Sequence, residues 1–156
     1  GLGWIGLVDR HPEKQEKAKA FGADAVFDRD DPAIAELPDK RGKLDAVIDA
    51  VGKPELVNAG LPLLKRGGSM CVYGFYAGLK EFSVGNALAD FNFNLFVHQW
   101  PTRLYEKEAQ GPICDWVREG KLSGSEFITH RFSMDQISDA LEAVRSRKVV
   151  KALLEY

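Results

Sequence analysis

Short apolar runs alternate with helical repeats along the chain, and this alternation predicts an α/β fold. In the middle of the chain, the apolar run Leu44–Gly52 precedes a helical segment that ends at a double glycine, and a second apolar run, Ser69–Phe75, follows. This order predicts a strand, a crossover helix and a second strand parallel to the first. The loops after Ala50 and Tyr73 are then expected at the carboxyl edge of the sheet, where open α/β sheets bind ligands.

Other periodic segments extend the pattern toward both ends of the chain. Pro12–Phe21 predicts a helix, since proline suits the first helical turn and Gly22 supplies the stop. Ser133 and Gln136 form a capping box ahead of the clearest helix. The apolar stripe of that helix consists of Met134, Ile137, Leu141 and Val144. The remaining predicted elements are strands at Ala25–Asp28, Phe127–Phe132 and Val150–Leu154, a short helical piece at Asp30–Leu37, a turn-rich connection at Pro38–Gly42, and a helical region at Thr102–Glu119 that Gly111 and Pro112 break in two.

The amino-terminal segment Gly1–Gly6 matches the dinucleotide-binding fingerprint G-x-G-x-x-G. That fingerprint acts only between a strand and a helix, where its glycines let pyrophosphate approach the helix amino terminus. Asp9 follows Gly6 by three residues, which leaves no room for such a helix. The favoured interpretation is therefore that Trp4–Val8 is itself a buried strand, apolar on both faces. The alternative is a genuine fingerprint whose helix and next strand are not part of this sequence.

If Trp4–Val8 is a strand, Asp9 lies at its carboxyl end. A carboxylate there can accept hydrogen bonds from a ribose diol and would repel a 2′-phosphate, which favours NAD over NADP. Arg10 stands directly beside it and can pair with a 2′-phosphate, so NADP stays possible. The plain alternative is a solvated aspartate at the start of a loop.

Composition narrows the class of protein. The 156 residues are 45% hydrophobic and 28% charged, as in ordinary globular proteins, and suffice for one domain with a substantial core. A net charge of -2 provides no basic field for nucleic acid or anionic lipid, and no apolar run is long enough to span a membrane. The two isolated cysteines, Cys71 and Cys114, form no disulfide framework, and no segment has the order of a signal peptide. A reducing cytoplasmic setting is therefore expected.

Seven segments stand in an informative order and spacing. They are Val8–Asp24, Leu44–Gly52, Leu64–Gly68, Val72–Gly74, Phe127–Phe132, Ser133–Ser146 and Val150–Leu154. The first four resemble the coenzyme domain of the medium-chain, zinc-type alcohol and polyol dehydrogenases, and the last three resemble the carboxyl-terminal region of that family. The resemblance covers nearly the whole chain. It implies an α/β fold with a Rossmann-like parallel sheet and flanking helices, apparently lacking its first strand-helix unit.

The resemblance also implies cofactor-binding roles for particular residues. In the family, the acid after the second strand holds the adenosine ribose, which falls on Asp9, with Arg10 beside it. The residues implied to line the coenzyme after the Leu44 strand are Ala50, Val51 and Gly52. The residues implied to contact its nicotinamide side are Tyr73, Gly74 and Phe75. Lys151 is implied to reach the pyrophosphate; for Lys151, Tyr73 and Phe75, ordinary structural roles stay open.

The segment Phe91–His98 is predicted to be the last strand of the sheet. By alternation, its residues Phe91, Phe93, Leu95 and Val97 share one apolar face. In the family the corresponding strand lies at the sheet edge and pairs with its twin, so the resemblance implies a homodimer, and an apolar edge needs such cover. We also expect two domains: a partial dinucleotide-binding domain at residues 1–101, and a segment at residues 102–156 that packs on a catalytic domain.

Hydride transfer in this family needs a zinc ion that three protein ligands hold. Those ligands come from an amino-terminal catalytic domain and from just before the first coenzyme strand, and this sequence contains neither region. Its scattered cysteines and histidines cannot rebuild the site. We therefore predict no catalytic residue and no metal ligand, and we do not expect the chain alone to oxidise an alcohol.

The functional expectation follows from the resemblance. It implies the coenzyme-binding portion of an NAD-dependent alcohol or polyol dehydrogenase, with a small alcohol as the substrate of the parent enzyme. A non-catalytic nucleotide-binding or dimerising module is the alternative. A methyltransferase also places an acid after its second strand, but the carboxyl-terminal segments disfavour it.

Overall fold

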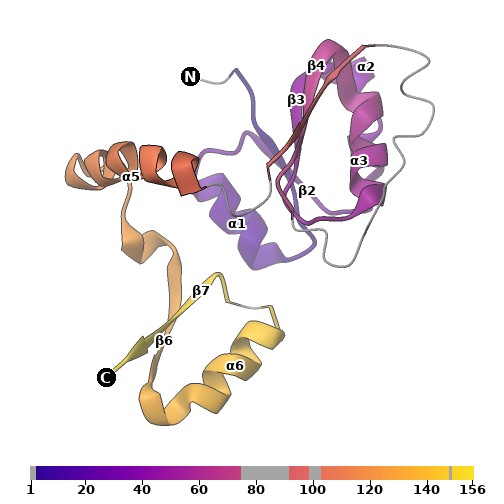
Figure 1. Ribbon diagram of the computed structural model, residues 1–156. Helices are drawn as coiled ribbons and strands as arrows, with labels where there is room; N and C mark the ends of the chain where they lie inside the picture. The colour runs from indigo at the N-terminus through magenta and orange to yellow at the C-terminus, as the bar shows by residue number, and fades with distance from the viewer. Residues whose placement is uncertain (1–2, 75–91, 99–102, 148) are drawn as a thin grey trace. The chain divides into compact units, whose positions relative to one another are not determined.

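The computed structural model describes residues 3–74, 92–98, 103–147 and 149–156, and it is an α/β structure in which every described strand pairing is parallel (Figure 1). The strand pairs and their bounds are β1 (Gly6–Val8) with β2 (Ala25–Phe27), β3 (Leu44–Asp49) with β4 (Leu64–Val72), β4 with β5 (Asn94–Val97), and β6 (Ile128–Ser133) with β7 (Lys151–Glu155). The helices are α1 (Pro12–Ala20), α2 (Leu37–Arg41), α3 (Pro54–Gly60), α5 (Arg103–Arg118) and α6 (Ile137–Arg145). The predicted fold class is confirmed.

The chain divides into two compact units. The first unit consists of residues 1–31 and 105–156, and the second consists of residues 32–104. The second unit contains β3, α3, β4 and β5, and the first contains the other strands together with α1 and α6.

The second unit holds the predicted strand, crossover helix and parallel strand. β3 and β4 run parallel, with Ala46 opposite Ser69 and Asp49 opposite Val72. The buried cluster consists of Val57, Leu61, Leu64, Met70 and Val72, each at most 2% exposed. Val57 and Leu61 are four residues apart and so share one side of the helical segment, while Met70 and Val72 alternate along β4. Burying a side chain of this size contributes about 1.5–3 kcal/mol, so this cluster holds the unit together.

The double glycine lies inside a strand, and its predicted place between helix and strand was wrong. β4 begins at Leu64, which is 2% exposed, because this leucine joins the buried cluster. Gly67 has a φ of +73°, and the pairing with β3 shifts register between Leu44 and Ala46. The two glycines thus form an irregularity in β4, a position where strand glycines are common.

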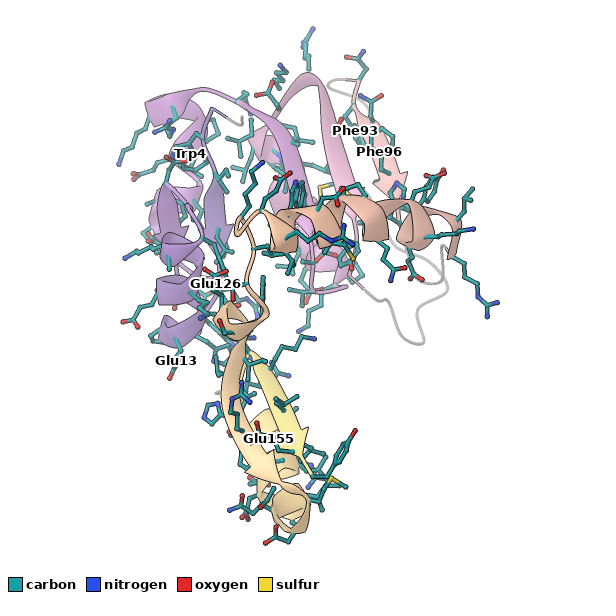
Figure 2. The ribbon with its side chains drawn as sticks, turned by 90° about the vertical axis from the view of Figure 1, so that its left-hand side faces the viewer. Trp4, Glu13, Phe93, Phe96, Glu126 and Glu155 are labelled. Carbon is teal, nitrogen blue, oxygen red and sulfur yellow. The ribbon has the colours of Figure 1, made fainter. Side chains whose placement is uncertain are left out.

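The amino-terminal strand is confirmed, but it is shorter and more exposed than predicted. β1 begins at Gly6, so this glycine lies in a strand and not at a strand-to-helix turn. A Cβ on Gly6 would meet the Trp4 ring at 2.4 Å, and Figure 2 labels this tryptophan. The side chains of Ile5 and Val8 are 40% and 50% exposed, so the expectation of a buried strand was wrong. In the described residues β1 pairs only with β2, and a strand with a single neighbour has one uncovered edge.

Helix α1 begins at the predicted residue and ends at Ala20, one residue before the predicted end. It begins at Pro12, and Gly22 follows it with a φ of +96°, a conformation that glycine adopts without a Cβ penalty. Phe21 lies at the end of the helix and stacks on Phe127, with ring centroids 5.1 Å apart.

Two helical predictions need correction. Residues 38–41 belong to helix α2 where a turn was expected, because Pro38 fits the first turn and Leu37, the first residue of α2, is buried. α5 continues from Arg103 to Arg118 with Pro112 inside it, although a break was predicted. Proline removes one helical hydrogen bond, and since every residue of α5 is exposed, water can satisfy the freed carbonyl.

The carboxyl-terminal helix α6 connects the parallel strands β6 and β7. Ser133 and Gln136 form the predicted capping box, and Gln136 Oε1 accepts a hydrogen bond from Ser133 N–H at 3.1 Å. Arg131 and Glu155 form an ion pair between the two strands, and Figure 2 labels Glu155 on β7. Ala140 is the buried residue of α6. The residues of the predicted apolar stripe are all exposed: Met134, Ile137, Leu141 and Val144.

The last strand of the three-stranded sheet is shorter than predicted. β5 spans Asn94–Val97, and Phe93 just before it packs against the buried cluster. Phe96, labelled with Phe93 in Figure 2, is exposed, as are Leu95 and Val97. Phe91, the first residue of the predicted strand, lies outside the described residues.

Candidate functional site

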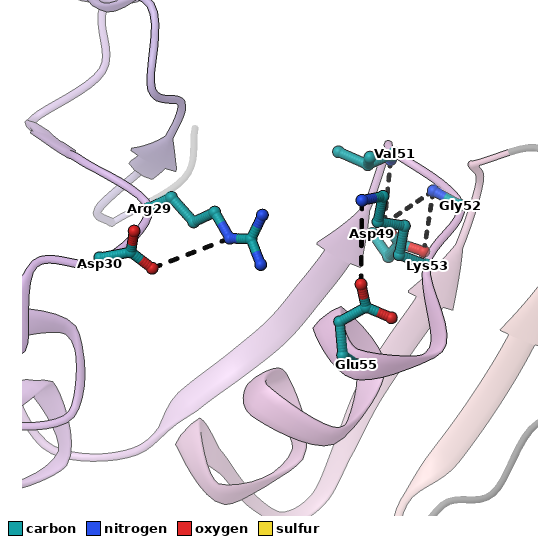
Figure 3. Close-up of polar contacts among 7 residues, drawn as sticks. All are labelled: Arg29, Asp30, Asp49, Val51, Gly52, Lys53 and Glu55. Atoms are coloured by element: carbon teal, nitrogen blue, oxygen red, sulfur yellow. Dashed lines mark hydrogen bonds and ion pairs between the residues drawn. The ribbon is translucent and has the colours of Figure 1, made fainter.

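The carboxyl ends of β3 and β4 bring together two of the predicted cofactor-binding segments. Asp49 is the last residue of β3, and Val51 and Gly52 follow in its loop (Figure 3). Asp49 Oδ1 accepts hydrogen bonds from Val51 N–H at 2.9 Å and from Gly52 N–H at 3.1 Å. An aspartate that binds backbone N–H groups two and three residues ahead fixes a tight turn, so the loop after β3 has a defined shape.

The loop after β4 is tied to the same residue. The carbonyl oxygen of Asp49 accepts hydrogen bonds from Tyr73 N–H at 2.9 Å and from Gly74 N–H at 2.8 Å. A Cβ on Gly74 would lie 1.9 Å from Gly52 N and 2.5 Å from the carbonyl carbon of Val51. The two loops therefore touch through backbone atoms, and only glycine fits at position 74.

The contact between the two loops also needs a glycine at position 52, because of the backbone conformation there. Gly52 has a φ of +87°, in the region that favours glycine. The neighbouring side chains point outward, with Val51 63% and Tyr73 67% exposed. Ala50 is exposed as well. The predicted set of Ala50, Val51, Gly52, Tyr73 and Gly74 thus forms one edge, on which Ala50, Val51 and Tyr73 are exposed while Gly52 is half-buried and Gly74 is buried.

The first unit carries the predicted acid. Asp9 follows β1, and its N–H continues the pairing with β2 by donating to Phe27 O at 3.1 Å. Its Oδ1 accepts a hydrogen bond from His11 N–H at 2.9 Å, and Arg10 Nε lies 3.3 Å from His11 Nε2. Asp9 also lines a cleft of about 340 Å³ beside α1, together with Lys14. The carboxylate is therefore held at the strand end, and its second oxygen has no hydrogen-bond partner among the residues described.

Two predicted residues stand apart from these groups. Lys151 is the first residue of β7 and is exposed, which leaves its amino group accessible. Phe75 lies outside the described residues. Cofactor binding by these positions, as by the others, stays a prediction.

Similarity to known proteins decides the family. A family of zinc-binding dehydrogenases matches the chain over residues 2–108, which is more than half of its length. The chain belongs to this zinc-binding dehydrogenase family. The resemblance seen in the sequence is thereby confirmed, and the chain corresponds to the coenzyme-binding part of these dehydrogenases.

Several relatives are alcohol or polyol dehydrogenases by name. An alcohol dehydrogenase class-3 from Myxine glutinosa is 27% identical over 165 residues, which cover 99% of this chain and 42% of the relative. A D-arabitol-phosphate dehydrogenase from Enterococcus avium is 27% identical over 148 residues, which cover 88% of this chain and 39% of the relative. The chain thus spans less than half the length of these curated zinc-binding dehydrogenases.

A solved structure supports the fold. An alcohol dehydrogenase from Escherichia coli CFT073, complexed with the cofactor NADH, matches with a TM-score of 0.80 at 22% identity. The match covers 99% of this chain and 45% of that protein. At this identity the likeness establishes the Rossmann-type fold.

The described residues do not supply a metal centre of this dehydrogenase family. Within residues 3–74, 92–98, 103–147 and 149–156, no three His, Cys, Asp or Glu side chains stand close enough together to hold a metal ion. Cys71 and Cys114 are both free. None of the helices in these ranges has the length and apolar character that crossing a bilayer requires.

The two carboxyl groups whose pKa is clearly shifted, Asp45 and Asp135, lie away from the two loops. Lys65 donates a hydrogen bond to Asp45 and lowers the pKa of that carboxyl, with its positive charge adding to the effect. The Ser133 hydroxyl lowers the pKa of Asp135 in the same direction. Both carboxyls are exposed, so these shifts describe surface pairs.

Sequence reasoning missed Asp49. It treated this residue as part of a strand, whereas in the structure its carboxylate binds the loop after β3 and its backbone carbonyl binds the loop after β4. The signal was present in the sequence, because an aspartate at a strand end followed by small residues and glycine is typical of a side-chain-capped turn.

Proposed function

We propose that the chain is the coenzyme-binding portion of an NAD-dependent, zinc-type alcohol or polyol dehydrogenase. The observation that carries this proposal is the close backbone contact of Gly74 with Gly52 at the carboxyl ends of two parallel strands. Ligands of open α/β sheets bind at this edge. Membership in the zinc-binding dehydrogenase family makes a nicotinamide dinucleotide the ligand that fits best.

Each predicted residue has a task in this proposal. Gly52 lets the main chain approach the cofactor without a Cβ in the way, Gly74 lets the loop after β4 pack on Gly52, and Val51 with Tyr73 cover the apolar parts of the cofactor. Asp9 accepts hydrogen bonds from the adenosine ribose, and Lys151 offers a positive charge to the pyrophosphate. Phe75 is assigned to the nicotinamide side by resemblance alone.

NAD is proposed over NADP because of the charges near the first strand. The carboxylate of Asp9 would repel a 2′-phosphate. Arg10 could attract one, but its Nε already lies 3.3 Å from His11 Nε2. The guanidinium is therefore directed toward the histidine, which supports NAD.

The chemistry of the parent enzyme would be the oxidation of an alcohol. A bound nicotinamide accepts the hydride, and this chain's residues only bind and orient the cofactor. The catalytic zinc and its ligands are proposed to belong to a part of the protein beyond these residues, since the relatives are more than twice as long as their matched regions.

Residues 102–156 are proposed to pack on that catalytic part, and residues 1–101 to form the partial dinucleotide-binding domain. The exposed apolar stripe of α6 supports this division. Leu141 and Val144 are more than half exposed although they lie on one side of an otherwise regular helix. Apolar surface of this kind commonly marks an interface.

A homodimer through β5 is also proposed. In the described residues β5 pairs only with β4, and its residues Leu95, Phe96 and Val97 are exposed. An uncovered apolar edge strand is a template for pairing with another strand. Sedimentation of the chain should give a dimer, and Phe96→Lys should give the monomer; a wild-type monomer at high concentration refutes this part of the proposal. The two free cysteines support a reducing, cytoplasmic setting.

Cofactor titration tests the main proposal. NADH added to the purified chain should show enhanced nicotinamide fluorescence and saturable binding, and NADPH should bind more weakly. Binding of S-adenosylmethionine without binding of NADH would instead indicate a methyltransferase. Binding of NADH by a full-length gene product that has no zinc-ligand region would favour the non-catalytic nucleotide-binding module.

A further inference from the structure

Among the described residues, Asp49 is the one charged residue that is buried, with 4% of its surface exposed. A carboxylate in such a place is costly unless hydrogen bonds replace its water. Both oxygens of Asp49 face the loop that follows β3: Oδ1 lies 2.9 Å from Val51 N, and Oδ2 lies 3.3 Å from Gly52 N (Figure 3). The hydrogen bonds from Val51 and Gly52 thus offset the cost of burying the carboxylate, and they also order the loop.

The main chain of the same residue holds the other loop. Asp49 O accepts hydrogen bonds from the N–H groups of Tyr73 and Gly74. The side chain therefore shapes the loop after β3 while the backbone fixes the loop after β4. Because the Gly74 backbone rests against Gly52, a change in the first loop is transmitted to the second.

We infer that Asp49 is the positioning residue of the dinucleotide site: its carboxylate sets the loop at residues 50–52 in the shape that binds the cofactor. This inference rests on the proposed function. The carboxylate acts through backbone amides and does not touch the ligand. Its effect is preorganisation, because a loop that is ordered before binding does not have to be ordered by the ligand.

The variant Asp49→Asn tests this role with little change in volume. Its amide oxygen can take the place of Oδ1, which accepts from Val51 and Gly52, but its NH₂ group cannot accept from Gly52 N–H as Oδ2 does, and the negative charge that strengthens the remaining bonds is lost. The Kd for NADH should rise about tenfold, as expected when one hydrogen bond to a charged group is lost from the loop. The matched control is Asp45→Asn on the same strand, whose side chain is 85% exposed and pairs with Lys65. This control should bind NADH as the wild type does.

Amide hydrogen exchange separates positioning from general stability. In Asp49→Asn the amides of Val51 and Gly52 should exchange faster, while the amide of Met70 in the core stays protected. A second measurement needs no variant: in the wild type without cofactor, Val51 and Gly52 should already be protected. This readout remains available if Asp49→Asn fails to fold.

The outcomes are distinct. If the wild type and Asp45→Asn bind no NADH, the proposed function falls and the inference falls with it. If the wild type binds and Asp49→Asn binds equally well, only the inference is refuted. It is also refuted if Met70 loses protection together with the loop, or if Val51 and Gly52 in the wild type exchange freely until NADH is added.

Discussion

Backbone contacts, more than side chains, define the candidate site at the scale of single residues. Gly74 lies so close to Gly52 that any side chain would overlap with backbone atoms. A collision with backbone is costly because neither loop can rotate away as a flexible side chain could. The chemistry of the site therefore depends on the absence of a Cβ at these positions.

The variant Gly74→Ala should destabilise the chain by about 1–3 kcal/mol, because overpacking forces the backbone to shift. NADH binding should weaken more than stability alone explains, since the shift occurs at the proposed site. Chemical denaturation and cofactor titration measure the two effects. Gly111→Ala is the control: it has open space around its Cβ and lies in helix α5, so it should stabilise by up to about 1 kcal/mol. Equal effects of the two variants would contradict the geometry.

The pair of Asp45 and Lys65 makes a second prediction at this scale. Lys65 lowers the pKa of Asp45 from its ordinary value of 3.8 in the folded state. The pair therefore stabilises the fold above the unfolded pKa, and this contribution is lost as the pH falls through the lowered folded pKa. An NMR titration should find Asp45 below its ordinary value, and Lys65→Met should raise it. A wild-type Asp45 that titrates at 3.8 would refute the pair.

At the scale of elements, an apolar periodicity does not by itself predict which side chains are buried. α3 and α6 both show apolar positions three or four residues apart. Leu61, directly after α3, is 1% exposed, whereas Leu141 in α6 is 54% exposed. The difference lies in the sheet that each helical segment packs on. The segment with Leu61 packs on a three-stranded sheet, and α6 packs on a two-stranded one.

Truncating these two leucines should have unequal effects. Leu61→Ala should cost about 2–5 kcal/mol of unfolding free energy, since it leaves a cavity in the core. Leu141→Ala should change it by about 0.5 kcal/mol or less, as for other surface substitutions. Urea denaturation of both variants measures the difference. A large loss in Leu141→Ala would show that the stripe of α6 is already covered in this chain.

At the scale of the whole molecule, the core is unevenly distributed. The second unit contains the buried cluster around Met70, while the buried apolar side chains described in the first unit are Ala140 and Val149. The strand pairing is uneven as well. The described sheets are two pairs in the first unit, β1 with β2 and β6 with β7, and a triplet in the second, β3 to β5.

Hydrogen exchange should reveal this distribution. The slowest amides should lie in the paired segments of β3 and β4, such as Val47 and Met70, because they are hydrogen-bonded and covered by the core. The amides of α5 should exchange fastest among the helices, since every residue of that helix is exposed. Exchange followed by mass spectrometry on the intact chain measures both. Uniform protection across the two units would contradict the uneven core.

Much of this could be predicted from particular residues. Proline at position 12 and glycine at position 22 delimited α1, because each fixes or frees φ in a way that no neighbour alters. The double glycine misled, because Gly67 and Gly68 break a helix or bend a strand equally well. Pro112 misled as well, because the loss of one hydrogen bond did not end an exposed helix. The turn capped by Asp49 could have been predicted from the glycine at position 52, but the hydrogen bonds of its carbonyl oxygen to Tyr73 and Gly74 could not, because those residues are distant in the sequence.

The sequence by itself determined the parallel strand-helix-strand unit and the positions of the glycines, since these follow from local order, periodicity and the absence of a Cβ, and its resemblance to known dehydrogenases indicated the family. Only the tertiary structure decided which apolar faces are covered and which carboxylate is buried. Those properties depend on residues distant in the sequence: Asp49 orders one loop through its side chain, and it holds the other only because β4 pairs beside β3.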